Sequence, residues 1–296
     1  MKIQKLKIIP LYAKVLFKKK SHVYENKTIQ GIIFSKDRPM QLYALLESYL
    51  KYCSPTPSVY VLYKISNEKY SVAYNEIKHI FYDKNIKFIE EKSFREDLIN
   101  ILQNISSEYL FFLVDDIIFK SFFSFEDYFA LSDRNNYILS LRLGSNLSYC
   151  YTKSLSQKLP SFKEKGLFLK WKWRKGELDW NYVFSVDGNV YATNEILEMS
   201  KKISFKAPNS YESNMNTFHY ILKRKDGLCY RNSVIINLCL NRVQNEFSNI
   251  SGKISSEKLL HLWSNGQKID IDYFYEINNI SAHIEIEQLP LINRYE

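Results

Sequence analysis

The sequence predicts an α/β fold, in which a mostly parallel sheet with helices on both faces is followed by a smaller mixed half. Short runs rich in β-branched and aromatic residues alternate with helical patterns through residues 28–145, and this alternation is typical of βαβ units. The runs are continuously apolar, as expected for strands that are buried on both faces. The 296 residues, of which 46% are hydrophobic, are sufficient to bury a large core.

The first half contains four apolar runs that we predict to be strands, and they cover residues 29–35, 58–64, 86–90 and 109–114. The first intervening helix is expected to begin at Pro39, where the missing N–H group of proline costs little. The helix after the third strand is expected to begin at Ser93, with Glu96 completing a capping box. Ligands bind such sheets at the carboxyl ends of the strands.

The second half is less regular, and no repeat or low-complexity linker separates it from the first. A strand is predicted over residues 137–144, a helix from Pro208 and a last buried strand from Ser233. We therefore expect one continuous unit.

The net charge of +9 is compatible with nucleic acid, a membrane surface or a small phosphorylated ligand as partner. Lysines are spread along the chain and no nucleic-acid-binding motif appears, so we expect no nucleic-acid partner. The four cysteines are far apart, without a CxxC pair, and indicate neither a zinc site nor a disulfide framework. Thiols of this kind are expected in a reducing compartment, which favours a cytoplasmic location.

The first 20 residues combine seven lysines with interleaved Ile, Leu and Val. This stretch lacks the uninterrupted apolar core of a signal peptide, and no segment has the roughly 20 apolar residues that span a bilayer. Two interpretations remain open. The stretch is either a peripheral anchor on anionic lipid at the inner face of the membrane, or a solvated leader.

The stretch YLFFLVDDIIF, residues 109–119, places Asp115 and Asp116 directly after a buried strand. Two adjacent carboxylates in such a place are costly unless a metal or a basic group compensates them. Mg²⁺ and Mn²⁺ prefer oxygen ligands and leave positions open for phosphate oxygens. The pair therefore predicts a site for a divalent metal and a diphosphate, and the alternative is a solvated loop or a helix N-terminus.

The motifs GIIFSKDRPMQLYALLESYL and FLVDDIIF resemble those of glycosyltransferases with the GT-A fold, particularly the family-2-like group, and the order of elements matches over roughly residues 28–250. The resemblance implies a GT-A-like, Rossmann-like fold. It also implies a nucleotide-sugar-binding half at 28–145, an acceptor-side half at 146–250 and a C-terminal extension at 251–296, preceded by the basic leader at 1–27.

The resemblance also implies roles for residues of the D-x-D motif, which holds a divalent metal against the diphosphate of the donor in this family. Asp116 occupies the last position and would bind Mn²⁺ or Mg²⁺, while Asp115 in the middle would contact the metal, the ribose or the donor sugar. Val114 stands at the first position, so metal binding depends mainly on one carboxylate. The residues expected to contact the nucleotide sugar are Ser35, Arg38, Lys64, Arg95, Asp115 and Arg242.

Transfer with inversion needs a carboxylate that deprotonates the acceptor hydroxyl. Glu212 matches in order the acidic base of the family, although Tyr211 and Ser213 flank it where an acidic pair is usual. Asp187, in a turn beside Gly188, is the second candidate, and it would otherwise orient the acceptor or the donor sugar. For the tryptophans of segment 160–182, stacking on sugar rings and a local core are both open.

The predicted function is a metal-assisted, inverting glycosyltransferase. It would move a sugar from a nucleotide-diphosphate donor to a saccharide or lipid-linked acceptor, in the synthesis of a surface polysaccharide or glycolipid. Two alternatives stay open: a non-catalytic sugar- or lipid-binding module on a decayed transferase scaffold, and a nucleotidyltransferase that makes the sugar nucleotide.

Overall fold

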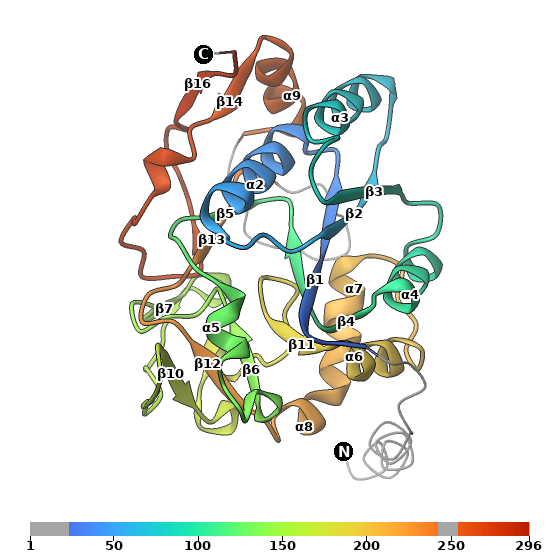
Figure 1. Ribbon diagram of the computed structural model, residues 1–296. Coiled ribbons are helices and arrows are strands. Elements are labelled where there is room, and N and C mark those ends of the chain that lie inside the picture. Colours follow the sequence, from blue (N-terminus) through green and yellow to red (C-terminus); the bar gives the residue numbers. More distant parts are fainter. Residues whose placement is uncertain (1–23, 242–253, 296) are drawn as a thin grey trace.

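A five-stranded sheet forms the centre of the computed structural model, which describes residues 24–241 and 254–295 (Figure 1). Its strands lie in the order β11-β4-β1-β2-β3. Their bounds are Glu25–Lys36 for β1, Val59–Lys64 for β2, Ile86–Glu90 for β3, Ser107–Val114 for β4 and Val190–Ala192 for β11. Strand β1 is parallel to both β2 and β4, and β2 is parallel to β3, whereas β11 is antiparallel to β4. The predicted α/β class with a mostly parallel sheet is confirmed.

The four predicted strands are all present, and β1 is longer than expected because it begins at Glu25, within the segment assigned to the leader. The helices between and after these strands are α2 (Pro39–Tyr52), α3 (Glu68–Ile80), α4 (Phe94–Asn104), α6 (Thr193–Ser200), α7 (Pro208–Met215) and α9 (Ser256–Ser264). Proline stands at the first position of α2 and of α7, as predicted.

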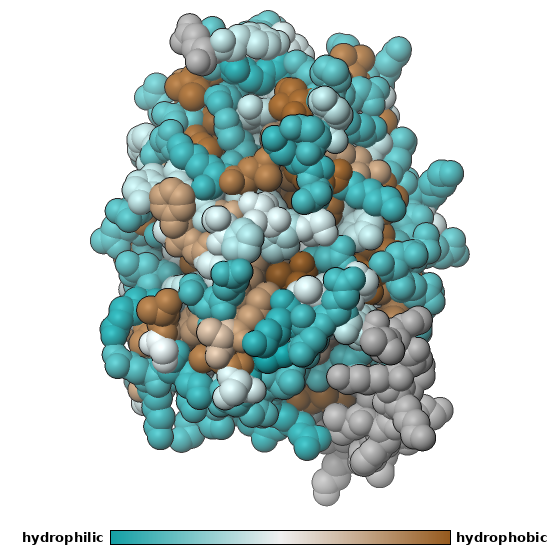
Figure 2. All heavy atoms as spheres, viewed as in Figure 1, coloured by the Kyte–Doolittle hydropathy of each residue, from teal (hydrophilic) through white to brown (hydrophobic). Residues whose placement is uncertain are grey.

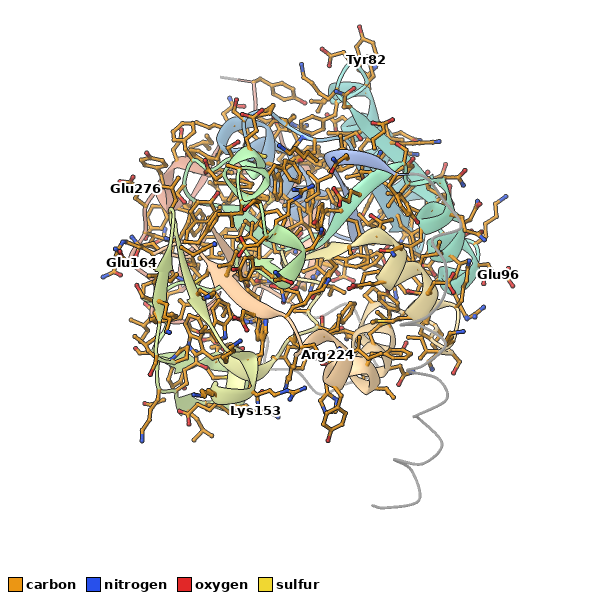
Figure 3. The ribbon with its side chains drawn as sticks, turned by 60° about the horizontal axis from the view of Figure 1, so that its bottom comes forward. Tyr82, Glu96, Lys153, Glu164, Arg224 and Glu276 are labelled. Carbon is orange, nitrogen blue, oxygen red and sulfur yellow. The ribbon has the colours of Figure 1, made fainter. Side chains whose placement is uncertain are left out.

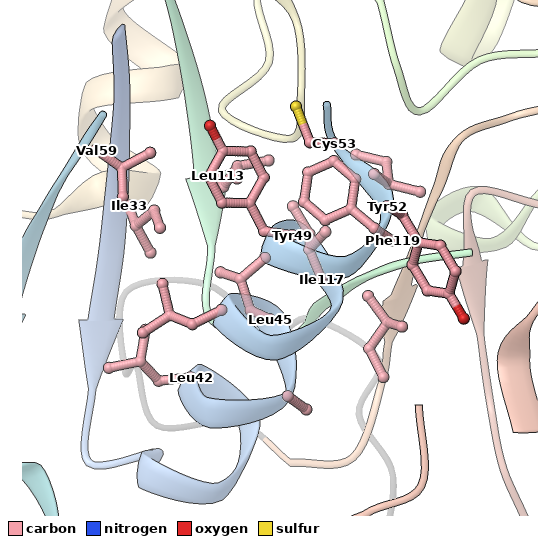
Figure 4. Close-up of a cluster of buried hydrophobic side chains, with 14 of the residues drawn as sticks. Ile33, Leu42, Leu45, Tyr49, Tyr52, Cys53, Val59, Leu113, Ile117 and Phe119 are labelled. Atoms are coloured by element: carbon pink, nitrogen blue, oxygen red, sulfur yellow. The ribbon is translucent and has the colours of Figure 1, made fainter. Parts of the chain in front are cut away.

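Both faces of the central sheet are covered. One core cluster joins Ile33 of β1 to apolar residues of α2, α3 and α9, and a second joins the neighbouring Ile32 to residues of α4, α6 and α7. Because successive side chains of a strand point to opposite faces, this division follows from the alternation along β1. Figure 4 shows Leu45 and Tyr49 of α2 beside Leu113 of β4 in the first cluster.

The capping box predicted at the start of α4 is not formed. The side chain of Ser93 makes no cap hydrogen bond. Instead, the carboxylate of Asp97 accepts hydrogen bonds from the backbone N–H groups of Lys92 and Ser93, at 2.7 and 2.8 Å. Asp97, one residue after Glu96, therefore accepts the capping hydrogen bonds that were expected for Glu96.

The second half forms a smaller mixed region below the central sheet in Figure 1. Its main sheet has the order β6-β12-β10-β9. The strands of this region are β6 (Tyr137–Ser140), β7 (Tyr149–Cys150), β8 (Leu155–Ser156), β9 (Lys163–Lys165), β10 (Phe168–Trp171) and β12 (Asp226–Cys229), and the short helices are α5 (Phe125–Phe129) and α8 (His219–Leu222). A separate two-stranded sheet of β14 (Gln267–Ile269) and β16 (Leu291–Asn293) lies beside α9 at the top of Figure 1. Strand β12 is parallel to β6 and antiparallel to β10.

A three-stranded sheet with the order β15-β13-β5 lies beside the central sheet. Its strands are β5 (Ile117–Phe119), β13 (Ile235–Leu238) and β15 (His283–Ile284). The chain leaves β4 at Val114, turns through Asp115 and Asp116, and enters β5 directly. The two aspartates therefore occupy the junction between two sheets.

The tryptophans of segment 160–182 form a local core, so the reading in which they stack on sugar rings is wrong. Trp171, Trp173 and Trp180 are at most 2% exposed. The ring of Trp171 packs edge-on against both others, with centroid distances of 4.7 and 5.1 Å. The indole N–H of Trp171 also donates to the carbonyl oxygen of Trp180.

Apolar side chains are scattered over a mainly hydrophilic surface on the face shown in Figure 2. Among residues 24–241 and 254–295, no helix combines the length and the apolar character that crossing a bilayer requires.

Gly227 of β12 gives a test of this packing. A Cβ atom at this position would overlap the indole ring of Trp171, its partner in the register of β10. Because overpacking of a closed core forces side chains off their rotamers, we expect Gly227→Ala to lower the free energy of unfolding by about 1–3 kcal/mol. Urea denaturation measures the change. Ser156→Ala, at an exposed strand position, is the control, and equal stability of both variants would contradict the packing described.

Candidate functional site

The candidate site lies where β1 and β4 end, at the carboxyl edge of the parallel sheet. Ser35 belongs to the last residues of β1 and Arg38 to the loop that follows, and the turn after β4 carries Asp115 and Asp116. The backbone N–H of Asp115 donates to the carbonyl oxygen of Phe34, at 3.1 Å, which continues the pairing of the two strands into the site. The sheet register therefore brings together two motifs that are about eighty residues apart in the sequence.

Asp115 is buried and directs its carboxylate toward the end of β1 and the loop that follows it. Its Oδ2 atom accepts hydrogen bonds from the Ser35 hydroxyl at 2.9 Å and from the backbone N–H of Lys36 at 3.0 Å. Its Oδ1 atom accepts from Nη1 of Arg38 at 2.8 Å. Burial and the neighbouring Asp116 raise the pKa of Asp115, against the opposing effect of Arg38. This geometry favours a role in holding the loop.

Asp116 has a different environment, because its side chain is 21% exposed. Its Oδ2 atom accepts from Nη1 of Arg38 at 3.1 Å, and its Oδ1 atom accepts from the side-chain amide of Asn237 at 3.3 Å. The backbone carbonyl of Asp116 accepts from the N–H of Leu238, at the end of β13. Of the acidic pair, Asp116 is the member that reaches open space.

Arg38 is the basic group that compensates the two acids. Its Nη1 atom contacts both carboxylates, while Nε and Nη2 donate to the side-chain and backbone oxygens of Asn241. Burial alone would lower the pKa of the guanidinium, but Asp115 and Asp116 outweigh burial and raise it. One guanidinium offsets one of two carboxylate charges, so the group keeps a net charge of −1 when both acids are ionised.

The loop that presents Arg38 is fixed from two sides. Asp37 has a left-handed backbone, with φ of 52°, and its carboxylate accepts from the N–H and the hydroxyl of Ser66. Tyr74 of α3 is fully buried, and its hydroxyl lies 2.5 Å from the Ser35 hydroxyl and accepts from the backbone N–H of Arg38. A strained backbone of this kind persists where the surroundings hold it.

A second acidic pair, Glu212 and Asp187, lies in the second half. Glu212 belongs to α7, and its Oε2 atom accepts a hydrogen bond from the backbone N–H of Val186 at 2.9 Å. Burial, followed by the charge of Asp187, raises the pKa of Glu212 to about 7. A carboxylate with this pKa changes its protonation near neutral pH, as is useful for a general base.

The turn that carries Asp187 is pinned to the central sheet. Gly188 has φ of 76° and donates its N–H to the carbonyl oxygen of Phe112 in β4, at 2.7 Å. A Cβ atom at this glycine would lie 2.5 Å from a methyl carbon of Ile235. Both the backbone conformation and the close approach therefore require glycine beside Asp187.

The two acidic pairs approach each other along the three-stranded sheet. Asn237, which donates to Asp116, is the register partner of His283 on β15, and Nε2 of His283 lies 3.9 Å from Oδ2 of Asp187. Cys239 lies close enough to Asp116 and Asp187 for their charges to act on its thiol. Burial is the largest cause that raises the pKa of Cys239 to about 12, and the charges of these two acids add to it. The structure thus connects Asp116, the predicted metal ligand, with Asp187, one of the two candidate bases, through Asn237 and His283.

Arg142 compensates the second pair from inside the protein. Its side chain is 2% exposed and Nη1 lies 3.1 Å from Oδ1 of Asp179. Burial lowers its pKa, but the charges of Asp179, Asp187 and Glu212 outweigh burial and raise it. Its Nε and Nη2 atoms are buried without a hydrogen-bond partner among the described residues.

The other residues predicted to contact the nucleotide are placed differently. Lys64 ends β2 with a half-exposed side chain that pairs with Glu91 at 2.9 Å. Arg95 donates to the carbonyl oxygens of Lys201 and Ile203 and so anchors the end of α6. Arg242 lies outside the described residues.

A divalent metal would find one suitable ligand here. Within the described parts of the chain, no group of three or more His, Cys, Asp or Glu side chains could hold a metal ion. Mg²⁺ sites commonly use one or two carboxylates together with substrate phosphates and water. Asp116 is partly exposed and each of its oxygens accepts one protein hydrogen bond, so it fits such a shared site, whereas Asp115 is buried and its oxygens accept three.

Sequence reasoning missed Asn237, Asn241 and Arg142, and left His283 without a role. Asn237 offered a weak signal, because it is a polar residue inside the apolar run of β13. The other residues gave none, since their importance depends on contacts between segments far apart in the chain.

Comparisons with known proteins place the chain near glycosyltransferases. No protein-family model matches the sequence. The chain is 28% identical over 225 residues to the bifunctional glycosyltransferase pgtA of Dictyostelium discoideum; the match covers 65% of this chain and 28% of that protein. The chain therefore spans less than a third of the length of this curated relative. This similarity confirms the sequence resemblance to glycosyltransferases.

Solved structures with a similar chain trace include residues 1–349 of S. aureus TarS. This structure has 14% sequence identity and a TM-score of 0.46, and the match covers 70% of this chain and 59% of that one. Another is the mannosyltransferase PcManGT from Pyrobaculum calidifontis, in complex with GDP-Man and Mn²⁺. It has 12% identity and a TM-score of 0.42, with 78% of this chain and 63% of that one covered.

The charge compensation at the first acidic pair can be tested through stability. Arg38→Met would leave two carboxylates without their cation, and removal of one partner of a buried ion pair costs about 3–5 kcal/mol. We expect a loss of this size in urea denaturation at pH 7. Adding Asp115→Asn to the same chain should restore part of it, because one uncompensated charge is removed. Unchanged stability of Arg38→Met would contradict the role assigned to the guanidinium.

Proposed function

We propose that this chain is a glycosyltransferase that moves a sugar from a nucleotide-diphosphate donor to a saccharide or lipid-linked acceptor. The observation that carries the proposal is the position of Asp116. Asp116 is partly exposed at the carboxyl edge of the sheet, and it shares the single positive charge of Arg38 with Asp115. It is also connected through Asn237 and His283 to Asp187. The similarity to a curated glycosyltransferase supports the same conclusion.

On the donor side, Asp116 would hold Mn²⁺ or Mg²⁺. The metal would supply positive charge to the diphosphate, the leaving group of the reaction. Arg38 would also supply positive charge to the diphosphate, since a guanidinium binds phosphate oxygens well. Ser35 and Asp115 would act by keeping the loop of Arg38 in place. The proposal also includes contacts of Lys64, Arg95 and Arg242 with the nucleotide.

On the acceptor side, Glu212 would act as the base. Its carboxylate would take the proton of the acceptor hydroxyl while the acceptor oxygen forms a bond to the anomeric carbon. The bond from that carbon to the diphosphate oxygen would break, and the nucleoside diphosphate would leave with the electron pair. Attack opposite the leaving group inverts the anomeric centre. Asp187 would orient the acceptor and, through its charge, keep the pKa of Glu212 high.

Asp116→Asn tests the donor side. The substitution keeps the size of the side chain but removes the charge that a metal needs, so we expect Mn²⁺-dependent hydrolysis of sugar nucleotides to fall at least about 100-fold. Release of UDP or GDP from UDP-glucose, UDP-N-acetylglucosamine and GDP-mannose is the measurement. Asp83→Asn, at an exposed turn, is the matched control.

Two results would refute the donor-side proposal. Undiminished turnover by Asp116→Asn would exclude its role. Absence of hydrolysis by the unmodified chain, with every donor of the panel, would instead favour a non-catalytic binding module.

Glu212→Gln tests the acceptor side. A base must be deprotonated to act, and burial beside Asp187 raises the pKa of Glu212 to about 7. We therefore expect the transfer rate to fall as the pH is lowered through about 7, and Glu212→Gln to lose roughly 10²- to 10⁴-fold in rate. A profile of rate against pH from 5 to 9 checks this. If Glu212→Gln keeps the same activity and the same pH profile, another group is the base.

We also propose that residues 1–20 bind anionic membrane surface, which would bring the enzyme to a lipid-linked acceptor and to surface polysaccharide or glycolipid synthesis at the inner face. Seven lysines among apolar residues support this. Deleting residues 1–20 should release the protein from vesicles that contain anionic lipid, as measured by co-sedimentation. Replacing the seven lysines by glutamine is the second variant, and persistent binding of both would refute the anchor.

A further inference from the structure

A cavity of about 470 Å³ lies at the opposite end of the β5–β13 pair from the candidate site. It is bounded by the residues that follow β5, those that precede β13, and the segment 276–278 of the C-terminal extension. Its volume is within the range of roughly 300–1,000 Å³ that is usual for small-molecule sites. Figure 3 labels Glu276, one of its lining residues, at the edge of the molecule.

The cavity is separate from the acidic site. Asp116 precedes β5 and Lys120 follows it, so four residues of extended chain at about 3.3 Å each, on the order of 13 Å, lie between them. The pairing of Ile235 with Phe119 and of Asn237 with Ile117 confirms that the two sites lie at opposite ends of the strand pair. A ligand in the cavity would therefore not compete with one at Asp116.

Two side-chain amides of the cavity make no hydrogen bond within the described part of the chain. Asn232 and Asn278 are exposed, and neither side chain has a hydrogen-bond partner among the described residues. Each amide offers both donors and an acceptor, a combination that matches adjacent hydroxyl groups. Lys120 is 3% exposed, and its ammonium group makes one hydrogen bond within the described chain, to the carbonyl oxygen of Ile277 at 3.0 Å.

An aromatic ring stands at the rim of the cavity. Phe122 is 64% exposed, yet its orientation is fixed by Tyr52, whose ring lies edge-on at 5.1 Å, and by Tyr275 at 6.1 Å. Tyr230, on another wall, has its hydroxyl bound to Ser124 and Asp127. An exposed ring held in place offers an apolar platform at little entropic cost.

We propose that this cavity binds a sugar unit of a glycan, at a site distinct from the donor site. The charges of the cavity favour a neutral ligand over an anion, because among its described lining residues the positive charge of Lys120 is offset by the carboxylate of Glu276. The mixture of amide groups with an aromatic face favours a polyhydroxyl ring over a purely apolar ligand. The binding does not depend on transferase activity, and it would operate in a non-catalytic module as well.

An array of immobilised mono- to tetrasaccharides tests the proposal, with hexoses, N-acetylhexosamines, deoxyhexoses and uronic acids represented. We expect the full chain to bind at least one neutral class. The double variant Asn232→Ala/Asn278→Ala and the single variant Phe122→Ala should each weaken that binding at least about tenfold.

Matched controls are available on the same chain. Asn85→Ala removes an exposed amide elsewhere, Tyr82→Ala removes a ring that is 79% exposed and that Figure 3 shows far from Glu276, and Asp116→Asn alters the donor site alone. All three should bind the array as the unmodified chain does. A thermal shift with UDP and Mn²⁺, measured on every variant, reports the fold and the donor site independently.

Two results would overturn the proposal. One is the absence of binding to every neutral class. The other is binding that Asp116→Asn abolishes and that the cavity variants retain, because this would place the sugar at the donor site. Failure of UDP to shift any of the proteins would count against the proposed transferase and would leave the array result standing.

Discussion

The contact of Arg38 with Asp115 and Asp116 is the interaction on which the arrangement of the site depends. It joins the loop after β1 to the turn after β4, and through Asn241 it also reaches the segment after β13. Because a buried and a partly buried carboxylate side by side are costly without a cation, the guanidinium stabilises the turn between the two sheets. Because it supplies only one positive charge, the group keeps a net charge of −1 when both acids are ionised, and the proposed metal site at Asp116 depends on this charge.

The turn at Asp115 and Asp116 has a second effect, which concerns the position of the other acids. By leaving the central sheet for β5, the chain creates a strand against which β13 and then β15 can pair. His283 is brought in on the last of these strands, close to Asp187. His283 therefore lies near Asp187 because β15 pairs with β13, whereas the turn that carries Asp187 is itself held to β4 of the central sheet.

Much of the fold could be predicted because it follows from local patterns. The runs that became β2 and β3 are apolar over most of their length and were found within a residue of their bounds, and Pro39 correctly marked the start of α2. The capping of α4 was wrong because Glu96 and Asp97 are both acidic residues in the first turn, and their geometry decides which of them bonds. In the second half, the strands predicted over 137–144 and from Ser233 are present as the shorter β6 and β13, while the strands of two or three residues have patterns too brief to predict.

Some residues of the site could be predicted from the sequence and others could not, again depending on whether the signal was local. Ser35, Arg38, Asp115 and Asp116 were brought together by strand order alone, so sequence reasoning could place them. The tryptophans could not be assigned, since a charged segment does not reveal whether its aromatic residues turn inward. Asn241 and Arg142 were missed because their contacts join distant segments, and such contacts leave no periodic trace in the sequence.

The closed packing of Trp171, Trp173 and Trp180 determines what an optical experiment on this chain can observe. All three indoles are shielded from water in the second half, between β10 and the segment that follows it. Their native emission comes from apolar surroundings and should shift to longer wavelengths when this region opens. The emission of these three indoles consequently reports the second half, whereas Trp263 of α9, the fourth tryptophan, is buried against Tyr43 of α2 and reports that region.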